Sequence, residues 1–297
     1  MALSTTPVDT NRGTTNITLP AQLSADIWAS AQQESAVMQL AQQVTLPGSG
    51  LSIQVIAGDA TADWVAETAE KPVSKASFSV KTMTPYKIAV IELFSNELRR
   101  DLPALYDELA RRLPNSIAKK FDATVFNGTA PGSNFDVLTS ATAVAIGGTD
   151  VYGSLVGAYE TLAAADATLS GWAMSPQGKA ILLAATDGDS HPLFTTGTDT
   201  AALANILGAP VVDAKDAYKA GTSNNPNVVG FAGDWSQARY GIVDGINVSI
   251  SEEATVNDGT NQINLWQRNM FGLRVEAELG FVVKSSSAFV RLTDAAS

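Results

Sequence analysis

The chain of 297 residues contains no cysteine and a single histidine, His191. Without cysteine there can be no disulfide, no thiolate nucleophile and no zinc site with cysteine ligands. One histidine cannot supply a multi-histidine metal site, and it leaves a His-based catalytic triad with only one candidate. These absences exclude much of the usual enzyme chemistry, and they fit either side of a membrane.

The chain also has no segment typical of membrane insertion or export. No run of apolar residues approaches the ~18 of a membrane span, and residues 1–20 lack the basic start and apolar stretch of a signal peptide. Acidic residues outnumber basic ones by 30 to 19, which gives a net charge of −11. Such a chain repels phosphate backbones. We therefore expect no membrane partner, no sequence-reading contact with nucleic acid, and assembly in the cytosol.

The composition is that of a folded protein with apolar surface to cover. Hydrophobic residues make up 45% of the chain and charged residues 16%, which is typical of globular and not of disordered proteins. The mean hydropathy of +0.06 is mildly apolar, so part of the surface is expected to be buried against other subunits. The length allows one elaborate domain or two ordinary ones.

The first third of the chain predicts an arm and a long hairpin. Residues 1–20 are expected to be extended, and residues 21–33 to form a short amphipathic helix. Alternating apolar residues predict strands at 51–57 and within 76–93. The polar stretch between them places Trp64 and a Glu/Lys cluster at the hairpin tip. An aromatic residue has little core of its own to enter there.

An apolar residue at every fourth position predicts one long helix. The positions are Leu105, Leu109, Leu113, Ile117, Phe121 and Val125. Four residues advance a helix by about 400°, so the apolar face drifts by about 40° per step and meets different neighbours at its two ends. Pro114 is expected to kink or break the helix.

The same helix region concentrates positive charge. The residues are Arg99, Arg100, Arg111, Arg112, Lys119 and Lys120. We interpret them as a solvated face, or one that pairs with acidic neighbours in other subunits, in preference to a nucleic-acid surface.

The rest of the chain mixes helices and short strands. A helix from about 149 is expected to place Leu155, Tyr159 and Leu162 on one side. A second helix begins with Ser175 as its cap and Pro176 in its first position. Short strands follow, and the last segment predicts a loop and two strands that return to an earlier layer. The fold class is α+β with long protruding elements.

Two clusters could carry chemistry, and both have a plainer explanation. Asp187, Asp189 and His191 could hold a cation, but such Asp-Gly-Asp segments are more often turns. The adjacent pair Glu252 and Glu253 could suggest glycosidase carboxylates, yet neighbours on a strand point to opposite faces. No phosphate-binding loop or nucleophile elbow occurs. We predict no catalytic residue, no metal and no cofactor.

The order of these elements resembles the major capsid proteins of tailed bacteriophages with the Hong Kong 97 fold. The most specific stretch is WVAETAEKPVSKASFSVKTMTPYKIAVIELFSNELRRD, which is similar to the family's extended loop and its entry into a spine helix. KKFDATVFNGTAPG is similar to the end of that helix. LGAPVV, GDWSQARYGIVDGINVSIS and RNMFGLRVEAELGFVVKSSSAFVRL resemble later family segments in the right order.

The resemblance implies a division of the chain. Residues 1–50 would be an N-terminal arm with a short helix, and residues 51–92 the extended loop, a β-hairpin. Residues 93–145 and 255–297 would form a peripheral domain with the spine helix, and residues 146–254 a compact α/β axial domain.

The resemblance also implies a function. Identical chains would assemble as hexamers and pentamers of an icosahedral phage shell that encloses DNA without reading its sequence. The expected partners are a separate scaffolding protein, a portal and a decoration protein, and the protein would reside in the virion after assembly in the host bacterial cytoplasm. One alternative is an encapsulin-like nanocompartment shell; a more distant one is an acidic enzyme that uses carboxylates.

The resemblance points to two sets of residues. The hairpin would lie across a neighbouring subunit, with Trp64, Glu67, Glu70 and Lys71 as contact residues. Some shells of this family are locked by an isopeptide bond between a hairpin lysine and an asparagine, with a glutamate as base. Asn269 and Glu276 stand where the acceptor and base would be, and Lys71 and Lys75 are the possible nucleophiles.

Overall fold

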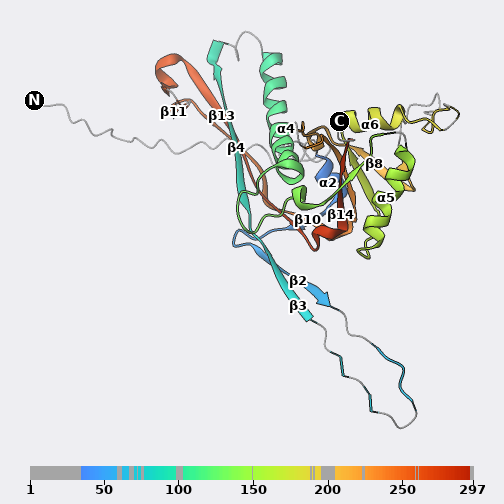
Figure 1. The fold of residues 1–297 in the computed structure, drawn as a ribbon. Helices are drawn as coiled ribbons and strands as arrows, with labels where there is room; N and C mark the ends of the chain where they lie inside the picture. The colour runs from blue at the N-terminus through green and yellow to red at the C-terminus, as the bar shows by residue number, and fades with distance from the viewer. Residues whose placement is uncertain are drawn as a thin grey trace, which may run out of the picture.

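The computed structural model describes residues 35–58, 62–66, 70–71, 73–74, 77–97, 103–148, 150–187, 189, 191–194, 205–222, 225–257, 259 and 261–294. The predicted arm and the helix predicted at 21–33 lie outside these ranges. Within them, a four-stranded sheet and a six-stranded sheet form the body, and a two-stranded hairpin leaves it (Figure 1). None of the described helices is long and apolar enough to cross a membrane.

The four-stranded sheet has the order β1 (Gln42–Thr45), β10 (Ala238–Ser251), β13 (Met270–Val283) and β4 (Tyr86–Ser95). The β1–β10 pair is parallel and the other two pairs are antiparallel. The alternate residues of β13 are buried on one face: Phe271, Leu273, Val275, Ala277 and Leu279. This two-residue period is that of a strand with one face on the core.

The predicted long helix is present as α4 (Pro103–Asn127), and it runs without interruption through Pro114. The residues at the predicted period from Leu113 onward are buried: Leu113, Ile117, Phe121 and Val125. Ala118, Asp122 and Phe126, each next to one of them, are buried as well. The ring of Phe121 lies 6.2 Å from that of Phe135, 6.5 Å from that of Tyr240 and 6.3 Å from that of Phe281. These edge-to-face contacts join α4 to β10, β13 and the loop after the helix.

The six-stranded sheet has the order β5 (Thr142–Ala145), β14 (Phe289–Thr293), β9 (Val228–Gly233), β6 (Gly171–Met174), β8 (Ala209–Asp213) and β7 (Asn205–Ile206). Helix α5 (Val151–Ala163) packs on β5 and β14, and α6 (Pro176–Leu183) packs on β6 and β9. The predicted cap is confirmed, because the Ser175 side chain accepts a hydrogen bond from Gly178 N. Leu155 and Leu162 are buried as predicted, but Tyr159 is exposed on α5.

The remaining elements are short. They are α2 (Ala36–Leu40), the strand pair β11 (Thr255–Asn257) and β12 (Gln262–Asn264), and one-turn 3₁₀ helices at Leu138–Ser140, Lys215–Ala217, Trp235–Gln237, Trp266–Arg268 and Ser286–Ala288.

The strand pairing crosses the predicted domain boundaries. The resemblance places strands β5 and β14 in the peripheral domain, yet they lie in the sheet of β6, β8 and β9. It places strand β10 in the axial domain, yet β10 pairs with β13 and lies in the sheet of β4. The chain passes between the two sheets several times, so no cut along the sequence at residues 145 and 254 separates them.

The hairpin pairs β2 (Leu51–Gly58) with β3 (Ser77–Met83) and projects far from both sheets (Figure 1). The prediction that it extends to residue 92 is wrong, because Tyr86–Ser95 pairs with β13 in the body. Thr84 and Pro85 separate the two strands, and the chain changes sheets at that point. The alternating pattern is the same on either side, since both segments are strands.

Candidate inter-subunit surfaces

The two clusters considered as a possible cation site and a possible catalytic carboxylate pair lie at the surface. Oδ1 of Asp187 accepts hydrogen bonds from the backbone N of Asp189 (2.9 Å) and of His191 (2.8 Å), which is how a carboxylate closes a turn. The bond from His191 N is the main cause that lowers the pKa of Asp187. Glu252 and Glu253 lie exposed in a bend after β10 and not within a strand. In the described part of the chain, no three His, Asp or Glu side chains form a metal-binding group.

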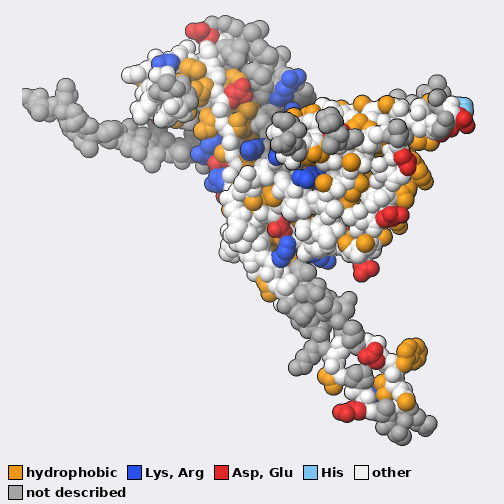
Figure 2. All heavy atoms as spheres, in the orientation of Figure 1, with side chains coloured by type: hydrophobic (Ala, Val, Ile, Leu, Met, Phe, Trp, Pro, Cys, Tyr) orange, Lys and Arg blue, Asp and Glu red, His pale blue; other side chains and the backbone are white. Residues whose placement is uncertain are grey.

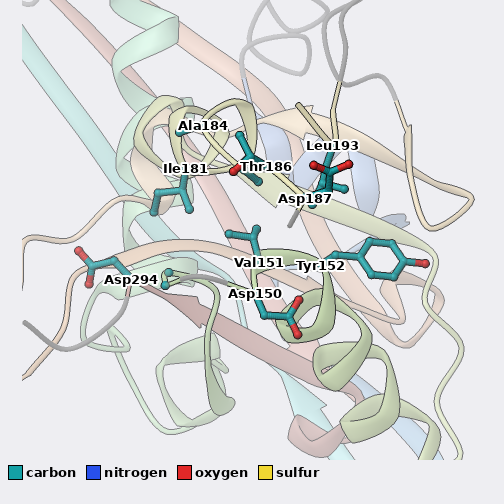
Figure 3. A pocket seen from close by; sticks show the side chains of 12 residues that line it. Asp150, Val151, Tyr152, Ile181, Ala184, Thr186, Asp187, Leu193 and Asp294 are labelled. Carbon is teal, nitrogen blue, oxygen red and sulfur yellow. The ribbon is translucent and has the colours of Figure 1, made fainter. Parts of the chain in front are cut away.

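A hollow of about 1010 Å³ lies beside the start of α5 and the end of α6 (Figure 3). Three carboxylates line it, and each already has a structural partner. Asp150 caps α5 by accepting a hydrogen bond from Gly153 N at 2.7 Å. Asp187 closes its own turn, and Asp294 accepts a hydrogen bond from Asn227 N at 2.7 Å. This hollow therefore has no pair of free carboxylates poised for acid–base catalysis among its described residues.

The hairpin tip exposes its apolar side chains. Trp64 is 106% exposed and Val73 is 89% exposed in the single chain, and hydrophobic atoms stand out at the end of the hairpin (Figure 2). Asp63, Glu70 and Lys71 are also exposed, whereas Glu67 and Lys75 lie outside the described residues. Folded proteins rarely leave a Trp so fully in water. The tip is therefore a surface that another molecule is expected to cover.

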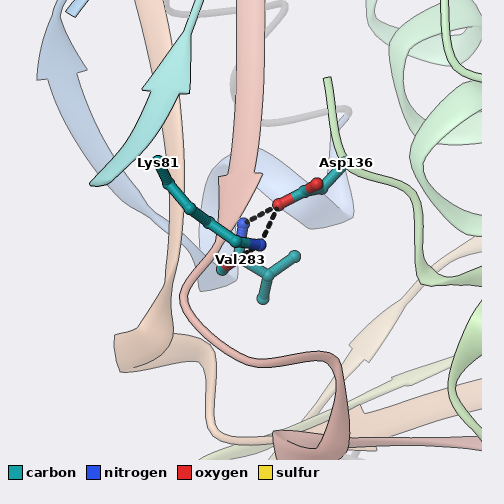
Figure 4. A network of polar contacts seen from close by, with 3 residues as sticks. All are labelled: Lys81, Asp136 and Val283. Carbon is teal, nitrogen blue, oxygen red and sulfur yellow. Dashed lines mark hydrogen bonds and ion pairs between the residues drawn. The ribbon is translucent and has the colours of Figure 1, made fainter. Parts of the chain in front are cut away.

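The root of the hairpin, in contrast, is fixed to the body. Lys81 Nζ donates to Asp136 Oδ2 (2.8 Å) and to the carbonyl oxygen of Val283 (2.6 Å), while Val283 N donates to the same Asp136 oxygen (2.9 Å; Figure 4). A small apolar cluster lies beside this network: Leu46, Ile53, Met83 and Val282. The hairpin thus begins at an anchored point and ends at an unsupported tip.

The predicted acceptor of the isopeptide bond, Asn269, and its predicted base, Glu276, lie in different surroundings. Asn269 is exposed in the left-handed conformation at a φ of 54°, and its Oδ1 accepts a hydrogen bond from Asn96 Nδ2 at 3.1 Å. Glu276 lies within β13, where its largely covered carboxylate is 3.6 Å from Arg274. Seven residues of extended strand separate the two by roughly 20 Å. One chain therefore does not bring Asn269, Glu276 and Lys71 together.

The basic face of α4 is partly described. Arg112, Lys119 and Lys120 are exposed, while Arg99 and Arg100 and the side chain of Arg111 lie outside the described part. The three described cations fit the predicted solvated face.

Sequence reasoning missed Asp122, a carboxyl group buried inside the body at 2% exposure. Its Oδ1 accepts from Ser35 Oγ (2.5 Å) and its Oδ2 from Ala36 N (2.7 Å), so it binds the first turn of α2 to α4. Burial raises its pKa to about 7, against the opposing effect of these two hydrogen bonds. The sequence feature that could have indicated this burial is the position of Asp122 next to Phe121, one of the apolar residues that recur at every fourth position of the helix.

Comparisons with known proteins agree with one another. Residues 15–294 match the sequence model of the phage capsid family. The chain is 31% identical over 285 residues to the probable major capsid protein gp17 of Mycobacterium phage D29, a match that covers 92% of this chain and 88% of that protein. It is 23% identical to the major capsid protein of Staphylococcus phage 80alpha, with 94% and 85% covered.

Solved structures give the same fold. A structure from Gordonia phage Cozz matches with a TM-score of 0.74 at 24% identity, covering 89% of this chain and 87% of that chain. The capsid of a native GTA particle matches with a TM-score of 0.68 at 16% identity, covering 88% and 90%. The predicted α+β class and Hong Kong 97 fold are confirmed.

Proposed function

The chain belongs to the phage capsid family, and from that membership we propose that it assembles as hexamers and pentamers of an icosahedral shell around double-stranded DNA. Its relatives are structural capsid proteins, so the predictions of a major capsid protein and of no enzymatic activity are confirmed. The encapsulin-like alternative and the carboxylate enzyme are not favoured, because the relatives are capsid proteins of phages.

The observation that carries the proposal of self-assembly is the hairpin. An isolated two-stranded ribbon has marginal stability in water, and this one ends in a fully exposed Trp64. Burial against another copy would remove that apolar surface from water. The tip and the body are different surfaces, so a tip-to-body contact is heterologous, and such contacts generate rings when the rotation closes.

Assembly can be tested by negative-stain microscopy and size-exclusion chromatography of the purified full chain. We expect closed shells, sheets or ring-shaped capsomers, because the hairpin cannot bury its tip within one subunit. A stable monomer at high concentration and physiological salt, without particles by microscopy, would contradict the proposal.

The proposed partners follow from the family resemblance. A separate scaffolding protein would direct assembly in the host cytoplasm, a portal would occupy one vertex, and a decoration protein would bind the finished shell. The net charge of −11 supports a container for DNA, since a strongly basic wall would hold the packaged phosphate backbone tightly.

We also propose that an isopeptide bond between Asn269 and a hairpin lysine, Lys71 or Lys75, locks the shell, with Glu276 as the base. The neutral lysine amine would attack the side-chain carbonyl carbon of Asn269, and ammonia would leave as the new amide bond forms. Glu276 would take the proton that the attacking amine loses and pass it to the leaving nitrogen, which departs as ammonia. Because Asn269 and Glu276 lie far apart in one chain, the three groups would have to come from more than one copy.

The crosslink predicts a specific gel pattern. Mature particles boiled in detergent should run as a ladder of multimers above the 31.0 kDa monomer. Asn269→Asp and Glu276→Ala should each abolish the ladder, because one removes the amide that is attacked and the other removes the base. A single monomer band from wild-type particles would refute the crosslink and leave the shell proposal intact.

A further inference from the structure

A pocket of about 420 Å³ lies between α4, the start of β4 and the loop after α4. Its lining is apolar and aromatic over most of its extent: Tyr86, Ile88, Phe121, Pro131, Phe135 and Leu279. The volume is at the lower end of the range of pockets that enclose small molecules, and it suits one aromatic side chain with the backbone on either side of it.

The pocket is also lined by lysine side chains and by residues that carry a hydroxyl group. Lys87 and Lys120 line it and are exposed to solvent. Lys87 Nζ is 3.4 Å from Glu278, whereas Lys120 makes no ion pair with any described residue. Tyr86 and Thr124 also line the pocket, and a hydroxyl oxygen can accept a hydrogen bond. The site thus combines an apolar floor, hydrogen-bond acceptors and positive charge.

The hairpin tip has the complementary features. Its fully exposed Trp64 has an apolar ring and one N–H donor that needs an acceptor when buried. Trp64 follows Asp63, and Glu70 lies farther along the tip, both exposed. Across residues 59–76, four carboxylates (Asp59, Asp63, Glu67 and Glu70) outnumber two lysines (Lys71 and Lys75), a net charge of −2. Opposite charges at the two surfaces favour their encounter.

We propose that this pocket receives Trp64 from the hairpin tip of a second copy of the chain. The inference rests on the proposed self-assembly and names the surface that the tip meets. A chain cannot fill its own pocket in this way, because β3 leads away from the pocket-lining Tyr86 and covers about 20 Å before the tip begins. The hairpin projects outward from the body over that length (Figure 1).

A disulfide trap tests the contact directly, because the natural chain contains no cysteine. Val65→Cys places a thiol beside Trp64, and Thr129→Cys places one at the pocket, where Thr129 is exposed. Every variant in this experiment also carries Asn269→Asp, so that the proposed isopeptide bond cannot form. Assembled particles of the double cysteine variant should then give a ladder of multimers on a non-reducing denaturing gel, and reductant should collapse it to the monomer. Each single variant should run as a monomer.

A control pair of cysteines tests whether the ladder arises from random oxidation. Val65→Cys with Thr168→Cys places the second thiol at an exposed site on the body, outside the pocket, and it should give no ladder. Particles of the pocket pair that run as monomers, or a ladder from the Thr168 pair alone, would overturn the proposal. Wild-type protein that forms no particles at all would refute self-assembly instead, so the two failures are distinguishable.

A second measurement does not depend on the cysteines. Thr124→Trp should fill the pocket and raise the protein concentration needed for assembly by about 30-fold, with the circular dichroism spectrum unchanged. Thr168→Trp, at an exposed site on the body, should leave that concentration unchanged. Because Trp64 and the pocket act as one contact, adding Trp64→Ala to Thr124→Trp should raise the threshold less than threefold further. Independent, multiplying effects would overturn the proposal.

Discussion

Trp64→Ala is expected to raise the protein concentration at which capsomers or shells form by about 30-fold. Truncation of a central interface aromatic typically costs ~2 kcal/mol or more of binding free energy, which corresponds to that factor. The side chain is 106% exposed in the single chain, so its loss removes no packing within the subunit. The free energy of unfolding of the dissociated subunit should therefore change by less than about 0.5 kcal/mol.

Light scattering against protein concentration measures the assembly threshold, and urea denaturation of the dissociated subunit measures folding. Trp64→Phe is the matched control, since it keeps an aromatic ring and most of the apolar area; its threshold should lie between those of wild type and Trp64→Ala. Equal thresholds for wild type and Trp64→Ala would show that the tip is merely solvated. A large loss of folding stability would show that Trp64 packs within its own subunit.

The second prediction concerns the buried carboxyl group of Asp122. Its pKa is about 7 in the folded chain and 3.8 as the unperturbed value. A raised pKa means that the folded state holds the proton more tightly than the unfolded state does. The contribution of Asp122 to stability is therefore fully present below pH 3.8 and is lost as the pH rises to about 7. A difference of about three pKa units corresponds to roughly 4 kcal/mol.

Asp122→Asn removes the titration and keeps the shape of the side chain. Its amide oxygen can accept from Ala36 N, and its amide nitrogen can donate to Ser35 Oγ. Between pH 5 and 8, the free energy of unfolding of the dissociated wild-type subunit should fall relative to that of the Asn variant. Denaturant titrations at several pH values measure both. Parallel pH dependences would contradict the prediction, because the other titrating groups are common to the two proteins.

Asp122→Ala measures what the hydrogen bonds of Asp122 contribute to stability, apart from the titration of its carboxyl group. It leaves Ala36 N without its acceptor at the start of α2, and a buried donor without a partner costs ~1–3 kcal/mol. That loss should persist at every pH. The Ala variant should therefore be less stable than the Asn variant at both ends of the pH range.

Local sequence patterns predict the individual helices and strands well. They predict less well which strands pair when the partners lie far apart in the sequence. The four-residue period over Leu113–Val125 and the cap at Ser175 depend only on residues within a turn or two, and both are confirmed. The partner of Tyr86–Ser95 is β13, nearly two hundred residues along the chain. No local pattern distinguishes that partner from β2, so the hairpin was predicted too long.

The inter-subunit residues show the same limit. Exposure of Trp64 followed from the polarity of its neighbours, but the pocket is built by α4, β4 and a loop whose meeting depends on tertiary packing. Burial of Asp122 depends on α2 lying across α4. An amphipathic helix pattern assigns polar residues to solvent by default, so a carboxyl group that caps another helix is assigned to the wrong environment.

The way the hairpin is mounted has a mechanical consequence. The hairpin is attached to the body through the network of Lys81, Asp136 and Val283. Because the hairpin is long, a rotation of a few degrees at this attachment would move the tip by several times the displacement at the root. Two-stranded ribbons also twist more freely than wider sheets do, while a close-packed core resists deformation. Rings of five and of six subunits need different angles between neighbours. In the proposed shell, the ribbon would absorb that difference while the two sheets of the body keep their packing, and one sequence would then build both the curved and the flat parts.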